Sequence, residues 1–220
     1  MIKESLRQIL DRIPDSVTLV AVSKTKPNSD ILEAYESGQR IFGENKVQEL
    51  TQKYEDLPKD IEWHMIGHLQ SNKVKYIAPF VHLIHGIDSF KLLKEVNKQG
   101  EKNDRIIPVL LQFHIAQEDT KFGFSLDEAA DMLSSTEYKQ LCNVQIKGVM
   151  GMATFTSDSR QVREEFHDLK VIFDKLKTQF FNGNSDFKII SMGMSGDYEL
   201  AIEQGSNMIR VGSSIFGGRH

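Results

Sequence analysis

The chain has 220 residues, of which 40% are hydrophobic and 26% charged, and its formal net charge is −4 at pH 7. This length suits one domain spanning residues 1–220, and the slightly acidic charge balance argues against a nucleic-acid-binding surface. The single cysteine excludes an intramolecular disulfide and any multi-cysteine zinc site. The absence of a signal peptide or an apolar run of about 20 residues predicts a soluble, cytoplasmic protein without a membrane segment.

Apolar strand-like runs alternate with helix-like segments along the whole chain. Residues 2–13 carry apolar side chains at helical spacing, and Pro14 ends this first helix. Strands are predicted at residues 17–22, 40–42, 62–66, 81–85, 106–113, 144–150, 187–191 and 207–211. The intervening helices are predicted at residues 28–38, 45–57 and 71–77, around residues 90–96, after a capping box of Ser125 and Glu128, and at residues 162–176 and 195–204.

Eight strands alternating with helices predict parallel pairing and a single (β/α)8 TIM barrel. Only residues 212–220 follow the eighth strand, which is too short a segment for a full last helix. The N-terminal helix is therefore expected to replace it in the barrel wall. The alternative, an open doubly wound sheet, requires a glycine fingerprint after the first strand, but residues 23–27 contain no glycine.

The first strand is apolar throughout and runs into Lys24. A lysine at the end of a buried strand is costly unless it is solvated, paired or used chemically. Lys26 is a competitor, but it precedes Pro27 and is pushed into extended loop geometry. The sequence therefore favours Lys24 as a reactive amine at the C-terminal ends of the strands, where barrels carry their chemistry.

The loops after strands seven and eight, SMGMSGD and RVGSS, combine small residues with hydroxyl groups. Barrels commonly bind phosphate in these two loops. Glycines let backbone amides approach an oxyanion, and serines add hydroxyl donors. The candidate residues are Gly193, Gly196, Gly212, Ser191, Ser195 and Ser213. Two ordinary glycine turns are the alternative. A lysine opposite a phosphate site suggests pyridoxal 5′-phosphate (PLP) held as a Schiff base.

Arg210 lies at the end of the last buried strand and needs a partner. A pyridine nitrogen would serve, and an arginine there would keep that nitrogen unprotonated. An ion pair with an acidic neighbour is the alternative. His64 and His68 have a spacing seen in metal sites, but they straddle a strand end and no HExxH pattern is present, so no metal site is predicted.

Six motifs then carry a family resemblance. They are AVSKTKP (21–27), FGENKVQE (42–49), WHMIGHLQSNK (63–73), KFGF (121–124), SMGMSGD (191–197) and IRVGSSIFGGR (209–219). In this order they resemble the pyridoxal phosphate homeostasis proteins, which are similar to the N-terminal barrel of alanine racemase, the fold type III PLP barrel. The resemblance implies that Lys24 carries the Schiff base, that Arg210 faces the pyridine nitrogen and that Asn45 lies beside the ring.

The same resemblance implies that Ser191, Gly212 and Ser213 hold the phosphate, and the backbone argument adds Gly193. Two positions depart from the family pattern: Lys46 stands where an aromatic residue is common, and His114 where an asparagine is common. These departures concern the mouth of the pocket rather than the Schiff base or the phosphate contacts.

The function implied is a non-enzymatic carrier that binds, buffers and delivers PLP, with effects on amino-acid and keto-acid balance. Racemases of this fold take a tyrosine base from a second domain across a dimer, and none of the five tyrosines here lies at a predicted strand tip. No catalytic residue is therefore assigned, and a monomer with transient contacts to apo PLP enzymes is expected. A PLP-dependent racemase or other small PLP enzyme, and a Schiff-base aldolase barrel, are the alternatives.

Overall fold

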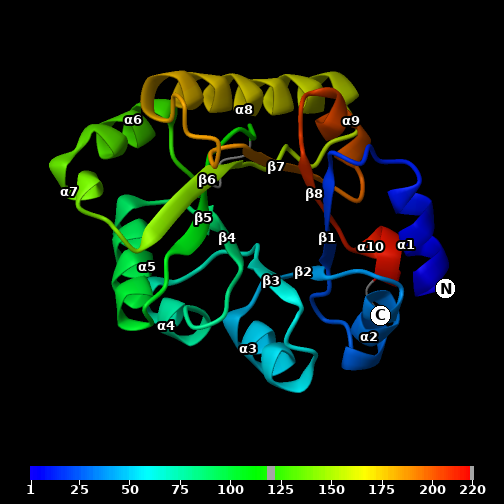
Figure 1. Ribbon diagram of the computed structural model, residues 1–220. Helices are drawn as coiled ribbons and strands as arrows, with labels where there is room; N and C mark the ends of the chain where they lie inside the picture. The colour runs from blue at the N-terminus through cyan, green and yellow to red at the C-terminus, as the bar shows by residue number, and fades with distance from the viewer. Residues whose placement is uncertain (118–121, 219–220) are drawn as a thin grey trace.

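The computed structural model describes residues 1–117 and 122–218. Its strands form a closed parallel barrel in sequence order, as predicted (Figure 1). They are β1 Thr18–Val22, β2 Ile41–Glu44, β3 Glu62–Met65, β4 Leu83–Ile87, β5 Ile107–Gln112, β6 Val144–Met150, β7 Ile189–Met194 and β8 Met208–Val211. β8 closes the barrel against β1, with Val20 opposite Arg210.

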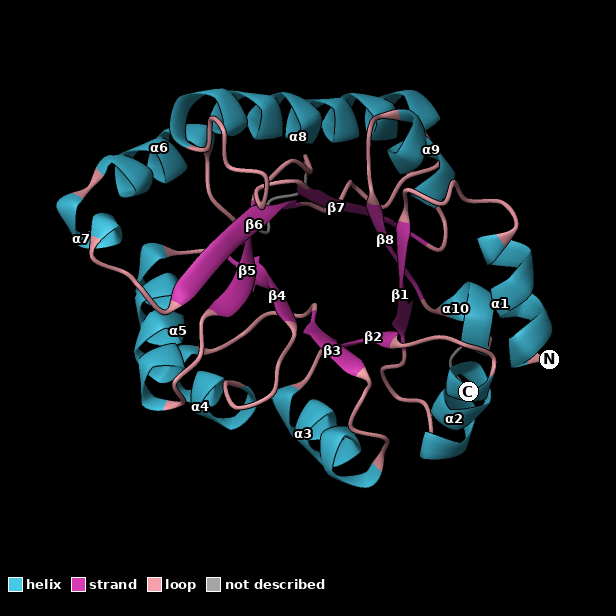
Figure 2. Cartoon of the chain, in the orientation of Figure 1, coloured by secondary structure: helices cyan, strands magenta, loops and turns pink. Residues whose placement is uncertain are grey.

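Helices surround the barrel on its outside (Figure 2). They are α1 Ile2–Leu10, α2 Asn28–Glu36, α3 Val47–Asp56, the 3-10 turn η1 Ser71–Lys73, α4 Val74–Ile77, α5 Phe90–Lys102, α6 Leu126–Ser134, α7 Thr136–Lys139, α8 Ser159–Phe180, α9 Tyr198–Glu203 and α10 Ser213–Phe216. The predicted capping box of α6 is confirmed: Ser125 accepts from the backbone of Glu128, and Glu128 accepts from the backbone of Ser125.

The N-terminal helix α1 lies beside α2 and the short α10, where a longer last helix would otherwise cover the barrel (Figure 1). Since α10 spans only Ser213–Phe216, the predicted replacement of the last helix by the N-terminal one is confirmed. Leu6 and Ile9 on the inward face of α1 are buried. Burial of this apolar face is what holds the helix on the barrel wall.

Several element boundaries differ from the sequence-based expectation. β7 runs three residues further than predicted, to Met194, and α9 begins at Tyr198 rather than at Ser195. A turn occupies the space between them, in which the Asp197 carboxylate accepts from the Met194 backbone at 2.6 Å. β4 lies two residues later than predicted. These shifts place Ser191 and His85 within strands rather than at strand ends.

Apolar side chains form two cores. The larger one lies between strands and helices and includes Phe42, Trp63 and Phe166. The smaller one fills the barrel interior and includes Val20, Leu110 and Met208. Alternation along the strands turns a set of polar side chains inward as well, and these are fully or almost fully buried: His64, His85, Ser191 and Arg210.

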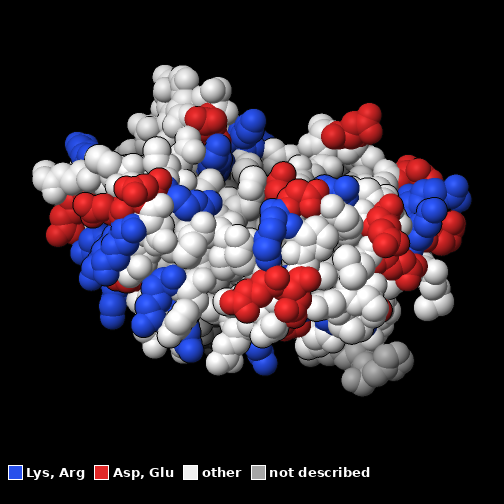
Figure 3. Space-filling model, turned by 60° about the horizontal axis from the view of Figure 1, so that its bottom comes forward, with Lys and Arg blue, Asp and Glu red and all other residues white. Residues whose placement is uncertain are grey.

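The surface carries charges of both signs. On the face shown in Figure 3, acidic and basic side chains are interspersed rather than separated into patches of one sign. No helix among the described residues is long and apolar enough to span a bilayer.

Candidate functional site

A pocket of about 540 Å³ opens at the mouth of the barrel, at the C-terminal ends of the strands. Small-molecule sites typically enclose about 300–1,000 Å³, so this volume suits a cofactor. Most of the predicted site residues line it: Lys24, Asn45, Arg210, Gly212 and Ser213. Segments far apart in the sequence meet here because all parallel strands present their C-terminal ends at one end of the barrel.

Ser191 and Gly193 do not line this pocket. Ser191 is fully buried in the barrel, where its Oγ accepts from Nη1 of Arg210 at 2.5 Å and lies 2.9 Å from Nδ1 of His85. Gly193 has a φ of +99°, and a Cβ there would lie 2.9 Å from Cα of Tyr198. Gly193 therefore allows β7 to approach α9 closely. Ser191 binds the Arg210 guanidinium from within the barrel.

Of the serines predicted after strand seven, Ser195 lines the pocket and Ser191 does not. The Oγ of Ser195 accepts from the Gly212 backbone at 3.2 Å, and Gly196 lines the pocket beside it. The difference follows from the length of β7, which carries Ser191 inside the barrel and places Ser195 in the loop beyond it. Gly212 is tightly confined, since a Cβ there would lie 3.0 Å from the Val22 carbonyl oxygen. The loops after β7 and β8 are thus joined at the pocket.

Arg210 forms the floor of the pocket and is only 4% exposed. Its Nη2 donates to the Gly151 carbonyl at 3.1 Å, in addition to the bond from Nη1 to Ser191. Burial lowers the pKa of Arg210 to about 10, so the guanidinium remains charged at neutral pH. These two partners are uncharged; Asp197, which lines the same pocket, acts on the guanidinium through its charge, and no ion pair joins the two among the described residues.

Lys24 is partly buried at the pocket, two residues after the end of β1. The next residue, Thr25, has a φ of +64°, which is unusual for a β-branched residue. Its backbone N–H donates to the Glu49 carboxylate at 2.6 Å. The competing lysine, Lys26, donates from Nζ to the carbonyls of Phe216 and Gly218, at 3.0 and 3.1 Å. The ammonium of Lys26 is therefore engaged by the segment around the end of α10.

A buried ionic network that we did not predict fixes the end of β1. Lys53 of α3 donates from Nζ to Glu44 and Glu49, each at 2.7 Å, and to the Ser23 carbonyl at 2.8 Å. The Ser23 hydroxyl donates to Glu44 at 2.6 Å. Burial raises the pKa of Glu44, while Lys53 and Ser23 act in the opposite direction. The network holds the backbone on both sides of Lys24, through Ser23 and Thr25.

Replacing Glu49 with alanine should loosen the backbone after Lys24 while the fold persists. Lys53 would keep Glu44 and the Ser23 carbonyl as partners, so we expect the free energy of unfolding to fall by only about 1–2 kcal/mol. The Thr25 amide would lose its acceptor, and its hydrogen exchange should accelerate by at least about tenfold. Exchange measured by NMR tests this, with the exposed Glu55→Ala on the same helix as the matched control. Unchanged exchange at Thr25 would contradict the role assigned to Glu49.

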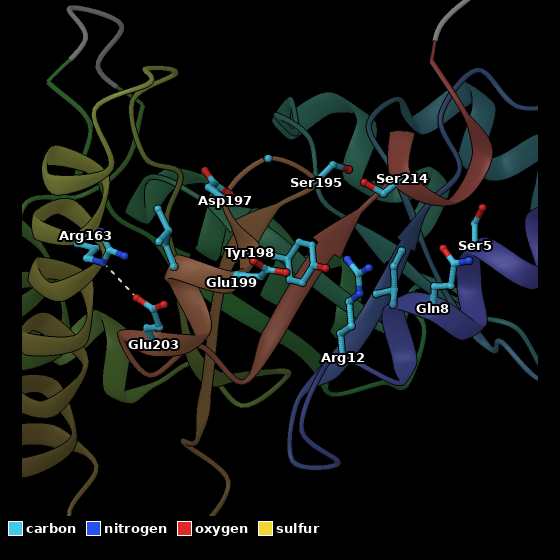
Figure 4. A pocket seen from close by; sticks show the side chains of 13 residues that line it. Ser5, Gln8, Arg12, Arg163, Ser195, Asp197, Tyr198, Glu199, Glu203 and Ser214 are labelled. Atoms are coloured by element: carbon cyan, nitrogen blue, oxygen red, sulfur yellow. Dashed lines mark hydrogen bonds and ion pairs between the residues drawn. The ribbon is translucent and has the colours of Figure 1, made fainter.

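A second depression lies on the outside of the barrel, between α1 and α9 (Figure 4). Its volume, about 530 Å³, is similar to that of the mouth pocket, with which it shares Ser195, Gly196 and Asp197. Two of its lining residues are arginines, Arg12 and Arg163, and Arg163 is paired with Glu203 at 3.0 Å. The outer depression contains neither Lys24 nor Arg210, so the mouth pocket is the better candidate site.

The two positions that depart from the family pattern lie outside the mouth pocket. Lys46 is exposed at the start of α3, and the backbone N–H of His114 donates to the Phe124 carbonyl at 3.2 Å after β5. Neither side chain lines the pocket. Three further residues of the sequence-based interpretation, Lys121, Arg219 and His220, lie outside the described residues.

The chain is similar to known proteins over its whole length. The family model described as the alanine racemase N-terminal domain matches residues 1–220. The pyridoxal phosphate homeostasis protein of Aquifex aeolicus is 36% identical over 98% of this chain and 97% of its own. That of Vibrio alginolyticus is 39% identical, over 94% of this chain and 89% of its own.

Solved structures agree with these relatives. The structure of PipY of Synechococcus elongatus PCC7942 with PLP bound is 34% identical and has a TM-score of 0.88, covering 99% of this chain and 100% of that one. Alanine racemase of Clostridium difficile shares the fold with a TM-score of 0.78, but it is only 13% identical, and the match covers 56% of that chain.

Proposed function

Because this chain belongs to the alanine racemase N-terminal domain family and, within it, to the pyridoxal phosphate homeostasis proteins, we propose that it binds PLP at the barrel mouth and serves PLP homeostasis without catalysing a reaction. The observation that carries this proposal is the convergence of Lys24, Arg210 and the Ser195–Gly212–Ser213 cluster on one pocket. These groups match an aldehyde, a pyridine ring nitrogen and a phosphate, respectively.

The residues present fit the cofactor. Nζ of Lys24 would attack the aldehyde carbon, whose oxygen leaves as water, and the product is the lysine Schiff base. Ser195, Ser213 and the tightly confined Gly212 would hold the phosphate with hydroxyl and backbone donors. Asn45 would lie beside the ring. We assign Ser191 and Gly193 supporting roles, in orienting Arg210 and in closing β7 on α9.

One feature supports a carrier over the alternative, a PLP-dependent racemase. Arg210 would keep the ring nitrogen unprotonated and so weaken PLP as an electron sink, but arginine is also a partner of this nitrogen in PLP enzymes, so this contact does not separate the two functions. The described residues that line the mouth pocket include no tyrosine that could act as a second base. Tyr198 instead lines the outer depression. The pocket can therefore hold PLP, but among the described residues it presents no tyrosine base to a bound amino acid.

The rim of the mouth pocket is open to solvent. Thr25, Gly196 and Ser213 are exposed there, so a bound cofactor would be accessible to a docking protein. We infer that a monomer in the cytoplasm passes PLP to apo enzymes by transient contact, and thereby affects amino-acid and keto-acid balance.

The test is an absorbance spectrum of the purified protein with PLP, before and after borohydride. We expect a band near the visible edge that borohydride removes, and mass spectrometry should then find the reduced adduct on Lys24. The holoprotein should not exchange the α-proton of single amino acids with D2O. Failure to bind PLP would overturn the proposal, and stoichiometric binding with rapid α-proton exchange would favour the racemase alternative.

A further inference from the structure

Three potential metal ligands meet at the end of the barrel opposite the mouth pocket. Glu62 begins β3, His64 lies within it, and His82 directly precedes the neighbouring β4. One ligand atom from each lies within 4.8 Å of the others. Nε2 of His82 is 3.2 Å from the Glu62 carboxylate, and the rings of His64 and His82 stack with centroids 5.7 Å apart.

His64 supplies a second, independent observation. It is only 2% exposed, and its Nε2 has no hydrogen-bond partner among the described residues. A buried polar atom left without a partner costs about 1–3 kcal/mol, so such atoms call for an explanation. The same ring is held from its other side, since Nδ1 lies 2.9 Å from Nε2 of His85. This is the arrangement of a metal-ligating histidine, whose second nitrogen is bonded to an orienting partner.

We propose that Glu62, His64 and His82 bind a transition-metal dication of the zinc class. Two imidazole nitrogens and a carboxylate oxygen are a ligand set typical of Zn²⁺ and unsuited to Ca²⁺ or Mg²⁺. Nε2 of His64 would gain the partner that it lacks. The side chains of Glu62 and His82 are 43% and 54% exposed, so they can adjust toward an ion that enters from solvent. Water would complete a four-coordinate site.

The hydrogen bonds behind His64 connect this site to the PLP pocket. His85 lies between His64 and Ser191, with Nδ1 2.9 Å from the Ser191 oxygen, and Ser191 in turn accepts from Arg210. An ion on Nε2 of His64 requires that the proton reside on Nδ1 and be donated to His85. His85 must then donate from its own Nδ1 to Ser191. A bound metal would thus set the direction of the two histidine bonds that lead to Ser191, which accepts from Arg210 in either case.

The experiment uses tag-free, chelator-treated protein without PLP, so its outcome is independent of the proposed cofactor function. Zn²⁺ is titrated in competition with a chromophoric chelator, and Co²⁺ is added separately as a spectroscopic probe. We expect one high-affinity ion per chain and the visible absorption of four-coordinate Co²⁺. Zn²⁺ should also raise the thermal unfolding midpoint, because an ion that binds only the folded state stabilises it.

Variants locate the site. Glu62→Gln and His82→Asn alter partly or largely exposed side chains, and each should weaken Zn²⁺ binding by at least about tenfold while the fold persists. The matched control is His68→Asn, which removes an exposed histidine 3.4 Å from Asp88 at the other end of β3. Absence of one-to-one binding, equal affinity in Glu62→Gln and His82→Asn, or an equal loss in His68→Asn would each overturn the proposal.

Discussion

Replacing Lys24 with alanine is expected to abolish the borohydride-reducible bond and to weaken PLP binding by at least about tenfold. The covalent attachment would be lost, whereas Arg210 and the Ser195–Gly212–Ser213 cluster would still hold the ring and the phosphate. Each tenfold change in affinity corresponds to about 1.4 kcal/mol. The measurement is the absorbance spectrum of the variant with added PLP, combined with equilibrium dialysis for the affinity.

Lys26→Ala is the matched control, because both lysines line the pocket and are two residues apart. Nζ of Lys26 donates to the Phe216 and Gly218 carbonyls, so its loss should loosen the segment after α10 but retain the band. If Lys26→Ala lost the reducible bond while Lys24→Ala kept it, the attachment would have to be reassigned to Lys26.

Replacing Lys53 with methionine should lower the free energy of unfolding by about 3–5 kcal/mol. Lys53 is 4% exposed, and Glu44 is fully buried. Methionine has a similar shape but no charge, so the Glu44 carboxylate would be left in the interior without its cation. Urea denaturation at pH 7 measures the loss.

The loss should also depend on pH. Burial already raises the pKa of Glu44, and removal of the Lys53 ammonium would raise it further. A carboxyl group whose pKa is higher in the folded than in the unfolded state takes up a proton on folding. The destabilisation in Lys53→Met should therefore shrink as the pH falls from 7 toward the folded-state pKa.

Lys170→Met provides the control, because Lys170 pairs with Asp174 on the surface of α8 at 2.6 Å. Surface pairs contribute about 0–1 kcal/mol, so this variant should stay close to the parent protein. Equal effects of the two substitutions would show that the Lys53 network does not hold the end of β1.

The site was partly predictable because parallel strands bring their C-terminal ends together. Lys24, Asn45, Gly212 and Ser213 follow strands, and Arg210 lies in the last one; the order of these strands along the chain is also their order in the barrel. Ser191 was assigned to the pocket because strand seven was predicted to end there. Strand ends are poorly marked when small residues such as those of SMGMSGD continue the strand without a change in polarity.

The Lys53 network and the metal-ligand cluster could not be found in the same way. Lys53 belongs to a polar, charged helix, and such residues usually face solvent. His82 and Glu62 are separated by a helix in the sequence and meet only because β3 and β4 pair side by side. In each case the interacting side chains come from different helices or strands, and the spacing of apolar residues does not predict which of these elements lie side by side.

The sequence by itself determined the barrel, the N-terminal helix that replaces the last helix in its wall, and the placement of Lys24 and Arg210 at the mouth. The spacing of apolar residues, the order of the strands along the chain and the cost of burying a charge can each be judged from the sequence. Only the tertiary structure decided that Ser191 lies inside the barrel while Ser195 reaches the pocket, that Lys53 anchors the end of β1, and that Nε2 of His64 has no hydrogen-bond partner among the described residues. These outcomes depend on where strands end and on which side chains face each other across the barrel interior, and both are set by packing.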